Sequence, residues 1–455
     1  MAQLILKTAL VTLICAVGLA SIAGASERYT WNGPYNVTTD PNQTYGFDPA
    51  MVQTQAGTFF ALMAGTVSGG GGVYLLSSSD GATWDSPAYV TSGWDECDII
   101  QGFDGFLYAA ISTGGGVEIW RGNSSGSGWA YWGQVVSIGG GSQYWTGSLC
   151  QAPDGMFYCA FMDHDGSSHH VYVSSSSDAV TWSSKVLVPA PGSGHYFDPN
   201  IAELNGVLHV VYNSYYNYEM WTCSSVDGGL NWTNPLQITN GASTSAFTGP
   251  SIAEGPDGAI VVAYGTSAKG LAISQSYDGG ATWTESQAQA SGNTPSIVRG
   301  QDGRLWIIYA DVVSSAWEVF TTSTTLSAPL TVDRHSFSGS APATVNFSLN
   351  AGTAYGGRNF LIAGSLSGTH PGTALPGGLA TIPLNRDWFT NWIIANLQLP
   401  VFSNFWGTLD GAGHAVAPMN VPTIPTWVGT TMYFAFATAN PWDFASNAVV
   451  VAVVP

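Results

Sequence analysis

Acidic and aromatic side chains recur together at intervals of about fifty residues in the first half of the chain. Tyr45-Gly46-Phe47-Asp48-Pro49 and Tyr196-Phe197-Asp198-Pro199 are near copies, and Glu96 and Asp98 follow Trp94 at the intermediate spacing. Such carboxylates can grip hydroxyl groups or act as general acid and base, while aromatic rings stack on sugar faces. The same acids could instead cap main-chain amides or hold a structural calcium ion.

These patterns give three sets of candidate residues. The candidate catalytic residues are Asp48, Glu96, Asp98 and Asp198. The candidate sugar-contacting residues are Tyr45, Trp94, Tyr144, Trp145, Tyr196, Asn200 and Tyr215. A polar loop with His169 and His170 after it contains Asp163 and Asp165, which could ligate a metal such as Ca2+; a solvated polar turn is the alternative. Acid–base chemistry of this kind requires no cofactor.

Tryptophans with the same period mark the elements that must position these residues. They are Trp31, Trp84, Trp132, Trp182, Trp232 and Trp283, separated by 53, 48, 50, 50 and 51 residues. The fullest segments before them are 225–232 and 276–283, two shortened copies end at Trp84 and Trp182, and the copy before Trp132 is degenerate. In such a segment Asp and Ser bond nearby amides, Gly supplies positive φ, and Trp covers the turn.

A second repeated element, an apolar strand on each side of a Gly turn, confirms the period. Its six copies begin at Asp48, Glu96, Thr146, Asp198, Gly249 and Thr294. Each unit then has four strands, which is typical of a propeller blade, so the sequence predicts six blades. We expect the segment at Trp31 to supply the outer strand that the sixth unit lacks and so to close the ring.

Aligning the six inner strands predicts two polar columns at the mouth of the central channel. The first column is Asp48, Glu96, Thr146, Asp198, Gly249 and Thr294. The second is Ala50, Asp98, Ser148, Asn200, Ser251 and Ser296.

The tryptophan segments resemble the Asp-box, or BNR, repeat S-x-D-x-G-x-T-W of the sialidase-like six-bladed propellers. The resemblance covers about residues 27 to 326. It implies that the boxes are scaffold and that the working face is the opposite one.

Sialidases also clamp a substrate carboxylate with three arginines and carry an F/Y-R-I-P segment. That segment is missing here, and the propeller contains only Arg28, Arg121, Arg299 and Arg304. Arg121 stands beside the degenerate copy and Arg304 follows a Gly turn, so both should lie away from the mouth. We therefore expect no true exo-sialidase.

The chain divides into three parts. Lys7, an apolar run over 8–22 and the small residues 23–25 predict a signal peptide over residues 1–25, hence a secreted protein, extracellular, periplasmic or on the cell surface. The propeller is expected over 26–326, and the short alternating runs of 327–455 predict an accessory β-sandwich. Nothing predicts a membrane span. Among the cysteines, Cys150 and Cys159 flank a Pro-Asp-Gly turn and form the one disulfide that we predict.

Composition limits the classes of molecule that the chain is expected to bind. Only 9% of the residues are charged and the net charge is -19, which argues against nucleic acid and suits neutral glycans or cations. Two functions stay open: a glycoside hydrolase-like enzyme for neutral or non-sialic glycans, and a non-catalytic carbohydrate- or protein-binding extracellular module. A scaffold whose acidic channel only holds calcium is a third reading.

Overall fold

The structure, a computed structural model, describes residues 29–38, 44–45, 48–67, 70–93, 96–137, 147–204, 206–215, 219–239, 249–255, 258–266, 269–301, 303–313, 316–325, 329–369 and 372–455. Nearly all of their regular structure is β-strand, as predicted. Among these residues, no helix combines the length and hydrophobicity that a membrane crossing needs. The predicted signal peptide lies outside the described residues.

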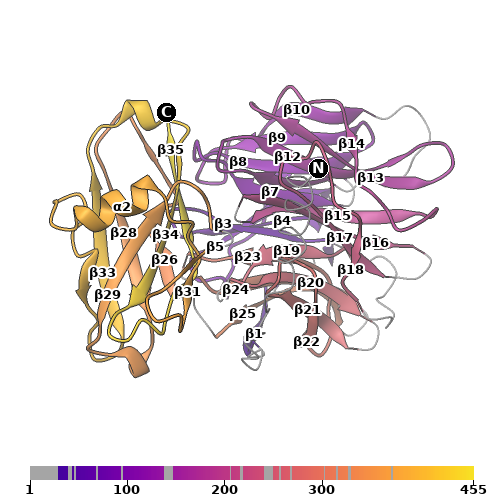
Figure 1. The fold of residues 1–455 in the computed structure, drawn as a ribbon. Coiled ribbons are helices and arrows are strands. Elements are labelled where there is room, and N and C mark those ends of the chain that lie inside the picture. Colours follow the sequence, from indigo (N-terminus) through magenta and orange to yellow (C-terminus); the bar gives the residue numbers. More distant parts are fainter. Residues whose placement is uncertain are drawn as a thin grey trace, which may run out of the picture.

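Six antiparallel sheets within the described residues form a β-propeller, which confirms the predicted fold (Figure 1). Their inner strands contact one another in cyclic order, and the last contacts the first, so the ring is closed. The inner strands are β3 (Ala50–Gln53), β7 (Cys97–Gln101), β11 (Gly147–Gln151), β15 (Tyr196–Leu204), β19 (Ser251–Glu254) and β23 (Asn293–Arg299).

Each blade continues outward from its inner strand. The second strands are β4 (Phe59–Val67), β8 (Leu107–Thr113), β12 (Phe157–His164), β16 (Val207–Ser214), β20 (Ile260–Thr266) and β24 (Leu305–Val313). The third strands are β5 (Gly70–Ser78), β9 (Gly116–Gly122), β13 (His169–Ser176), β17 (Met220–Ser225), β21 (Gly270–Ser276) and β25 (Ala316–Thr324). The outer strands are β6 (Ala88–Thr91), β10 (Ala130–Ser137), β14 (Val186–Leu187), β18 (Leu236–Gln237), β22 (Thr284–Gln289) and β1 (Trp31–Asn36), and β2 (Thr44–Tyr45) also pairs with β4.

The sixth blade takes its outer strand from the start of the described chain. Strand β1 pairs antiparallel with β25, and Trp31 lies opposite Thr324. The predicted closure is therefore confirmed. It removes the open sheet edge that β25 would otherwise present.

The tryptophan segments form side-chain-braced turns. In the fourth blade, Asp227 Oδ1 accepts the N–H of Asn231 at 2.9 Å, and Trp232 Nε1 donates to the Gly229 carbonyl at 3.1 Å. Segment 276–283 repeats this pattern, with Trp283 Nε1 donating to the Gly280 carbonyl at 2.9 Å. Asp and Gly are needed because the turn uses a carboxylate acceptor and residues with positive φ.

The second blade departs from the predicted position of its turn. Trp129 Nε1 donates to the Gly126 carbonyl at 3.0 Å, and Asn123 Oδ1 accepts the N–H of Ser125 at 3.1 Å. Trp132 instead donates to the carbonyl of Asp178 in the next blade. The turn-covering residue is thus Trp129, three residues before the tryptophan that the period singles out.

The predicted disulfide between Cys150 and Cys159 is wrong. Cys150 lies opposite Tyr158, and Cys159 lies opposite Leu149. Neighbouring residues of a strand point to opposite faces, so this one-residue offset turns the two thiols away from each other. All cysteines of the described chain are free.

Residues beyond the propeller form two sheets around a shared apolar core that includes Phe347 and Phe434. One sheet holds β26 (Leu330–Val332), β28 (Ala343–Asn350) and β33 (His414–Val421). The other holds β27 (Ser336–Ser338), β35 (Val449–Val454), β34 (Thr431–Thr438), β29 (Asn359–Ser365) and β32 (Trp406–Thr408). The smaller elements are η1 (Thr353–Tyr355), β30 (Thr373–Ala374), β31 (Thr381–Ile382), α2 (Trp388–Ala395) and η2 (Pro425–Trp427).

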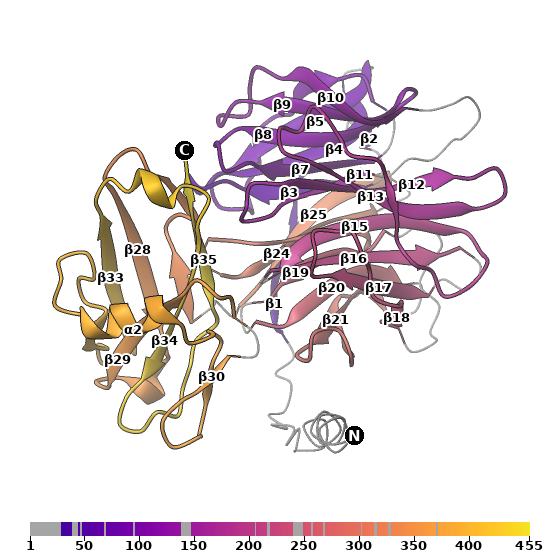
Figure 2. The same cartoon turned by 45° about the horizontal axis from the view of Figure 1, so that its top comes forward.

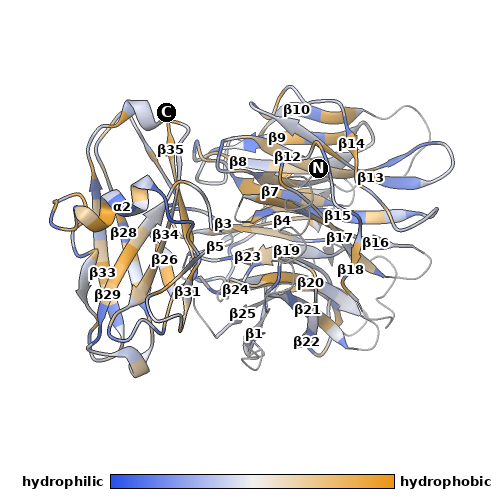
Figure 3. Cartoon of the chain, viewed as in Figure 1, coloured by the Kyte–Doolittle hydropathy of each residue, from blue (hydrophilic) through white to orange (hydrophobic). Residues whose placement is uncertain are grey.

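This C-terminal part sits against the Gly-turn face of the propeller. Gln55 Nε2 donates to Ser336 Oγ at 3.2 Å, and Thr431 Oγ1 donates to the Pro153 carbonyl at 3.2 Å. The β12–β13 hairpin extends on the side away from it, as do the start of β15 and the end of β16 (Figures 1 and 2). Figure 3 shows hydrophobic colour along the inner strands β7 and β19 and hydrophilic colour at the β12–β13 hairpin. The face that carries the starts of the inner strands is thus left uncovered by the C-terminal sheets.

Candidate functional site

A small recess of about 80 Å³, open to solvent, lies where the six inner strands begin. Every described residue of the two polar columns lines it, and Thr146 lies outside the described residues. The candidate acids Asp48, Glu96, Asp98 and Asp198 therefore converge on one opening. Their equivalent positions in the blades bring together residues that are up to 150 positions apart in the sequence.

The second column ties each blade to the next one. Each of its polar side chains accepts a main-chain N–H from the following inner strand. The acceptor–donor pairs are Asp98–Leu149 at 2.8 Å, Ser148–Ile201 at 3.2 Å, Asn200–Ile252 at 3.0 Å, Ser251–Ile297 at 3.0 Å and Ser296–Met51 at 3.3 Å. We call this ring the inner belt. It satisfies donors that the channel would otherwise leave unpaired.

Asp98 compensates for the one position of the inner belt that has no side-chain acceptor. Ala50, the first member of the column, has no side-chain acceptor to offer to Ile99. Asp98 Oδ1 accepts that N–H at 2.8 Å, while its Oδ2 accepts Leu149 N–H and the Ser148 hydroxyl. Burial nevertheless raises the pKa of Asp98 to about 6. Asp98, a candidate for catalysis, is thus held in a structural role.

The first column brings two carboxyl groups into one recess. Glu96 and Asp198, from the second and fourth blades, both line it and lie close enough to affect each other's ionisation, and Asn213 Nδ2 donates to Asp198 Oδ2 at 3.0 Å. Two carboxyl groups that share a site favour the state in which one of them carries a proton. Burial raises the pKa of Asp198, which favours that protonated state. The pair can therefore supply one acid and one base.

The backbone aims the first column toward the axis through an unusual conformation. Asp48, Asp198 and Thr294 have φ values of 62°, 48° and 45°, although none is glycine, and each precedes a proline. This left-handed conformation costs a non-glycine residue about 1–2 kcal/mol. At the equivalent position Gly249, an added Cβ would lie 3.3 Å from the Cβ of Asp198, so the glycine leaves room for that carboxylate.

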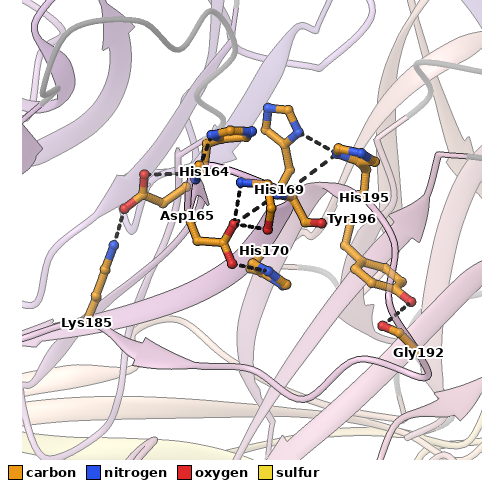
Figure 4. Close-up of polar contacts among 12 residues, drawn as sticks. His164, Asp165, His169, His170, Lys185, Gly192, His195 and Tyr196 are labelled. Atoms are coloured by element: carbon orange, nitrogen blue, oxygen red, sulfur yellow. Dashed lines mark hydrogen bonds and ion pairs between the residues drawn. The ribbon is translucent and has the colours of Figure 1, made fainter.

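Histidine rings gather beside the start of β15, the strand whose Asp198 lines the recess (Figure 4). The Nδ1 atoms of His169 and His195 lie 2.8 Å apart, so one ring donates and the other accepts. Phe197 lies 5.0 Å from His169 and Tyr215 lies 5.3 Å from Phe197, between ring centroids. Burial and then the neighbouring histidines lower the pKa of His169. His169 is therefore neutral at neutral pH, and the cluster offers polar ring edges and aromatic faces together.

The predicted sugar-contacting aromatics are only partly available to a ligand. Tyr215 is 40% exposed. Tyr196 is 4% exposed, packs edge-on against Tyr212 and donates to the Gly192 carbonyl, so its ring belongs to the core. Asn200 belongs to the inner belt. Trp94, Tyr144 and Trp145 lie outside the described residues, and of Tyr45 only the main chain is described.

The two aspartates predicted as metal ligands are engaged otherwise. Asp163 forms an ion pair with Lys185, and Asp165 accepts hydrogen bonds from Ser167 and His170. In the part of the chain that the structure describes, no group of three His, Cys, Asp or Glu side chains could hold a metal ion. These contacts match the alternative of a polar turn.

Arginine does not reach the recess within the described residues. Arg121 is stacked between Phe106 and Trp132, and Arg304 lies over Trp306. Arg299 pairs with Glu254 near the C-terminal sheets. Arg28 lies outside the described residues. The expectation that Arg121 and Arg304 lie away from the mouth is confirmed.

Sequence reasoning missed two residues of this site. His195 completes the histidine pair, and Asn213 supports Asp198 from the neighbouring strand. A signal existed for His195, because it stands immediately before the repeated Tyr-Phe-Asp-Pro motif. Nothing in the sequence marks Asn213, since its role depends on the β15–β16 register.

No protein-family model and no curated protein matches the chain. Among solved structures, the chain is similar to a protein of unknown function from Dyadobacter fermentans DSM 18053, at 15% identity and a TM-score of 0.55, over 65% of this chain and 98% of that one. It is also similar to an alpha-L-arabinanase of Penicillium chrysogenum complexed with arabinobiose, at 17% identity and a TM-score of 0.55, over the same shares. An alpha-L-arabinofuranosidase of Fusarium graminearum matches at 17% identity and a TM-score of 0.50, over 65% and 96%. These likenesses show a shared β-propeller fold.

Proposed function

We propose that this chain is a secreted, Asp-box, sialidase-like propeller that hydrolyses glycosidic bonds of neutral glycans at the recess. The observation that carries the proposal is the convergence of Glu96 and Asp198, two interacting carboxyl groups, on a solvent-open recess. Two carboxyl groups, one protonated and one ionised, are the usual acid and base of glycoside hydrolysis.

The pair accounts for all proton movements of the reaction. The protonated carboxyl donates to the glycosidic oxygen as its bond to the anomeric carbon breaks. The ionised carboxyl accepts a proton from the water whose oxygen bonds to that carbon. The proton has then moved from one member of the pair to the other, and no further group is needed. In an inverting site the two carboxyl groups stand roughly 6.5–9.5 Å apart, which leaves room for that water.

The charges of the recess select the substrate class. Asp48, Glu96 and Asp198 make the opening acidic, and no described arginine lines it, so a sugar carboxylate would be repelled. Neutral glycans avoid that cost. The fold shared with an arabinanase and an arabinofuranosidase supports this class. In the proposed site, Asp48 holds sugar hydroxyls and the cluster of His169, His195 and Tyr215 contacts the sugar chain.

Reducing-sugar release tests the proposal directly. Linear arabinan, xylan and a β-glucan are incubated with the wild type, with Glu96→Gln and with Asp198→Asn. We expect release by the wild type from at least one polymer and a loss of about 100-fold or more in either variant. Asp85→Asn, an exposed aspartate outside the recess, is the control and should keep full activity. Activity that survives both recess variants would contradict the assignment.

A non-catalytic carbohydrate- or protein-binding module is the second candidate. It is favoured by the lining of the recess, in which no described arginine is available to hold a charged substrate group. Saturable glycan binding without sugar release, unchanged in Glu96→Gln, would support this function over hydrolysis.

A further inference from the structure

A second cavity lies on the opposite face, between the propeller and the C-terminal sheets. It has a volume of about 1140 Å³, which is at the upper end of small-ligand sites. The propeller contributes His209, Ser224, Tyr277 and Gly279 to it, and the C-terminal part contributes Ser367 and Tyr433. We call it the interdomain cleft. It shares no lining residue with the recess.

His209 occupies a position that four other blades fill with a large aromatic ring, whereas the fifth blade has Val261 there. It lies opposite Ala202, two residues beyond the inner-belt residue Asn200. The residues with the same register in other blades are Phe60, Tyr108, Tyr158 and Trp306. These rings pack beneath the braced turn of the following blade, as the close approaches at three glycines show.

The smaller imidazole leaves space at the fifth blade. A Cβ added at Gly81 would lie 2.5 Å from Trp306, and one added at Gly126 would lie 2.5 Å from Phe60. At Gly228 it would lie 3.1 Å from the hydroxyl of Tyr158. At the equivalent Gly279, no described atom lies within 4 Å of such a Cβ. The hollow beneath this turn is part of the interdomain cleft, since His209 and Gly279 both line it.

His209 is 6% exposed and lines the interdomain cleft. Burial lowers its pKa to about 4, so the ring is neutral near pH 7, with one donor and one acceptor. Both ring nitrogens are available to a ligand in the cleft. One hydroxyl group of a ligand can donate to the unprotonated ring nitrogen, and a second hydroxyl group can accept from the protonated ring nitrogen.

We propose that the interdomain cleft binds a neutral oligosaccharide, with His209 exchanging hydrogen bonds with its hydroxyl groups and Tyr277 stacking on a sugar ring. Tyr277 is 54% exposed. Further hydroxyl partners are Ser224 and Thr369. Glu254 also lines the cleft and is paired with Arg299, so the lining favours an uncharged ligand. The site goes beyond the proposed hydrolysis, because it is a separate attachment point on the opposite face.

Isothermal titration of the full chain with arabinopentaose, xylopentaose and cellopentaose tests this site. The titrations use an Asp198→Asn background, so that hydrolysis cannot interfere. His209→Phe restores the aromatic ring of four other blades and should fill the hollow without unfolding the blade. Tyr277→Ala changes an exposed ring, so a folding defect is not expected from it. We expect saturable binding of at least one pentasaccharide, with Kd at least tenfold weaker in each cleft variant.

Tyr131→Ala, at a ring 52% exposed on another blade, is the matched control and should leave Kd unchanged. Absence of saturable binding by all three sugars would overturn the proposal. So would binding that is insensitive to both cleft variants. Because the background carries Asp198→Asn, a failure of the hydrolysis proposal would not alter this result, and the two failures can be told apart.

Discussion

Asp98 accepts the main-chain N–H of Leu149 in the next blade at 2.8 Å, and among the described residues this is the shortest inter-blade bond of the inner belt. The same carboxylate also serves Ile99, whose donor faces Ala50 in the preceding blade. One side chain thus bonds the second blade to the third and also satisfies a main-chain donor of its own blade. These hydrogen bonds explain the position of Asp98, which by itself does not indicate catalysis.

Removing this carboxylate should destabilise the whole propeller. Asp98→Ala leaves the N–H groups of Leu149 and Ile99 without their acceptors, at about 1–3 kcal/mol for each buried group. We expect a loss of about 2–4 kcal/mol in urea unfolding. Ser296→Ala deprives only Met51, bonded at 3.3 Å, and should cost less. Equal stability of the two variants would contradict the bridging role of Asp98.

Trp129 should matter more than an ordinary surface tryptophan. It covers the braced turn of the second blade and is partly buried against Gly122. Trp129→Ala should lower stability by about 2–3 kcal/mol, through lost packing and the lost bond to Gly126. Thermal unfolding monitored by circular dichroism measures this loss. Tyr131→Ala, two residues away and 52% exposed, should change little; a Trp129→Ala variant as stable as that control would refute the assignment.

Glu203 should make the propeller less stable at alkaline pH. Burial raises its pKa to about 7, above the ordinary value of 4.5. The folded state therefore favours the protonated carboxyl, and this stabilisation is full below pH 4.5 and is lost as pH rises through 7. Glu203→Gln should be more stable than the wild type by about 1–3 kcal/mol near pH 8.5 and equal to it near pH 4.5. Urea titrations at both pH values test this; a constant difference would contradict it.

The rate of the proposed hydrolysis should fall on the alkaline side. Burial raises the pKa of Asp198, and activity requires that one carboxyl group of the Glu96–Asp198 pair carry a proton. Once the pair loses that proton, kcat/KM should drop about tenfold per pH unit. Initial rates between about pH 4 and about pH 8 give the profile. A profile flat to the alkaline end would exclude the pair as the source of the acid.

Removal of divalent cations should leave the fold intact. Asp163 and Asp165 are already occupied by Lys185, Ser167 and His170. We expect the same melting temperature in EDTA and in calcium chloride, measured by differential scanning fluorimetry. A rise of a few degrees with calcium would mean that a site forms from groups outside those contacts.

The repeat period predicted the ring, its closure by Trp31 and the convergence of Asp48, Glu96 and Asp198, because equivalent positions of a propeller meet at one axis. The repeat period did not predict contacts that depend on the exact register of neighbouring strands. Cys150 and Cys159 face apart for that reason, and Trp129 replaces Trp132 because the spacing within a blade varies. The belt role of Asp98 could not be predicted, since it depends on which main-chain donors lack partners. Tyr196 repeats the motif around Tyr45, yet its ring turns into the core.

The pairing of β1 with β25 also sets the order in which the chain can fold. Trp31 and Thr324 are 293 positions apart in the sequence. Strand β1 therefore cannot pair until β25, near the end of the propeller sequence, has formed. Contacts of such long range are slow to form. Until then, β25 keeps an open edge that could pair with another chain. This protein is therefore most prone to misassociation just before the last step of folding, when five blades are complete and the sixth still lacks its outer strand.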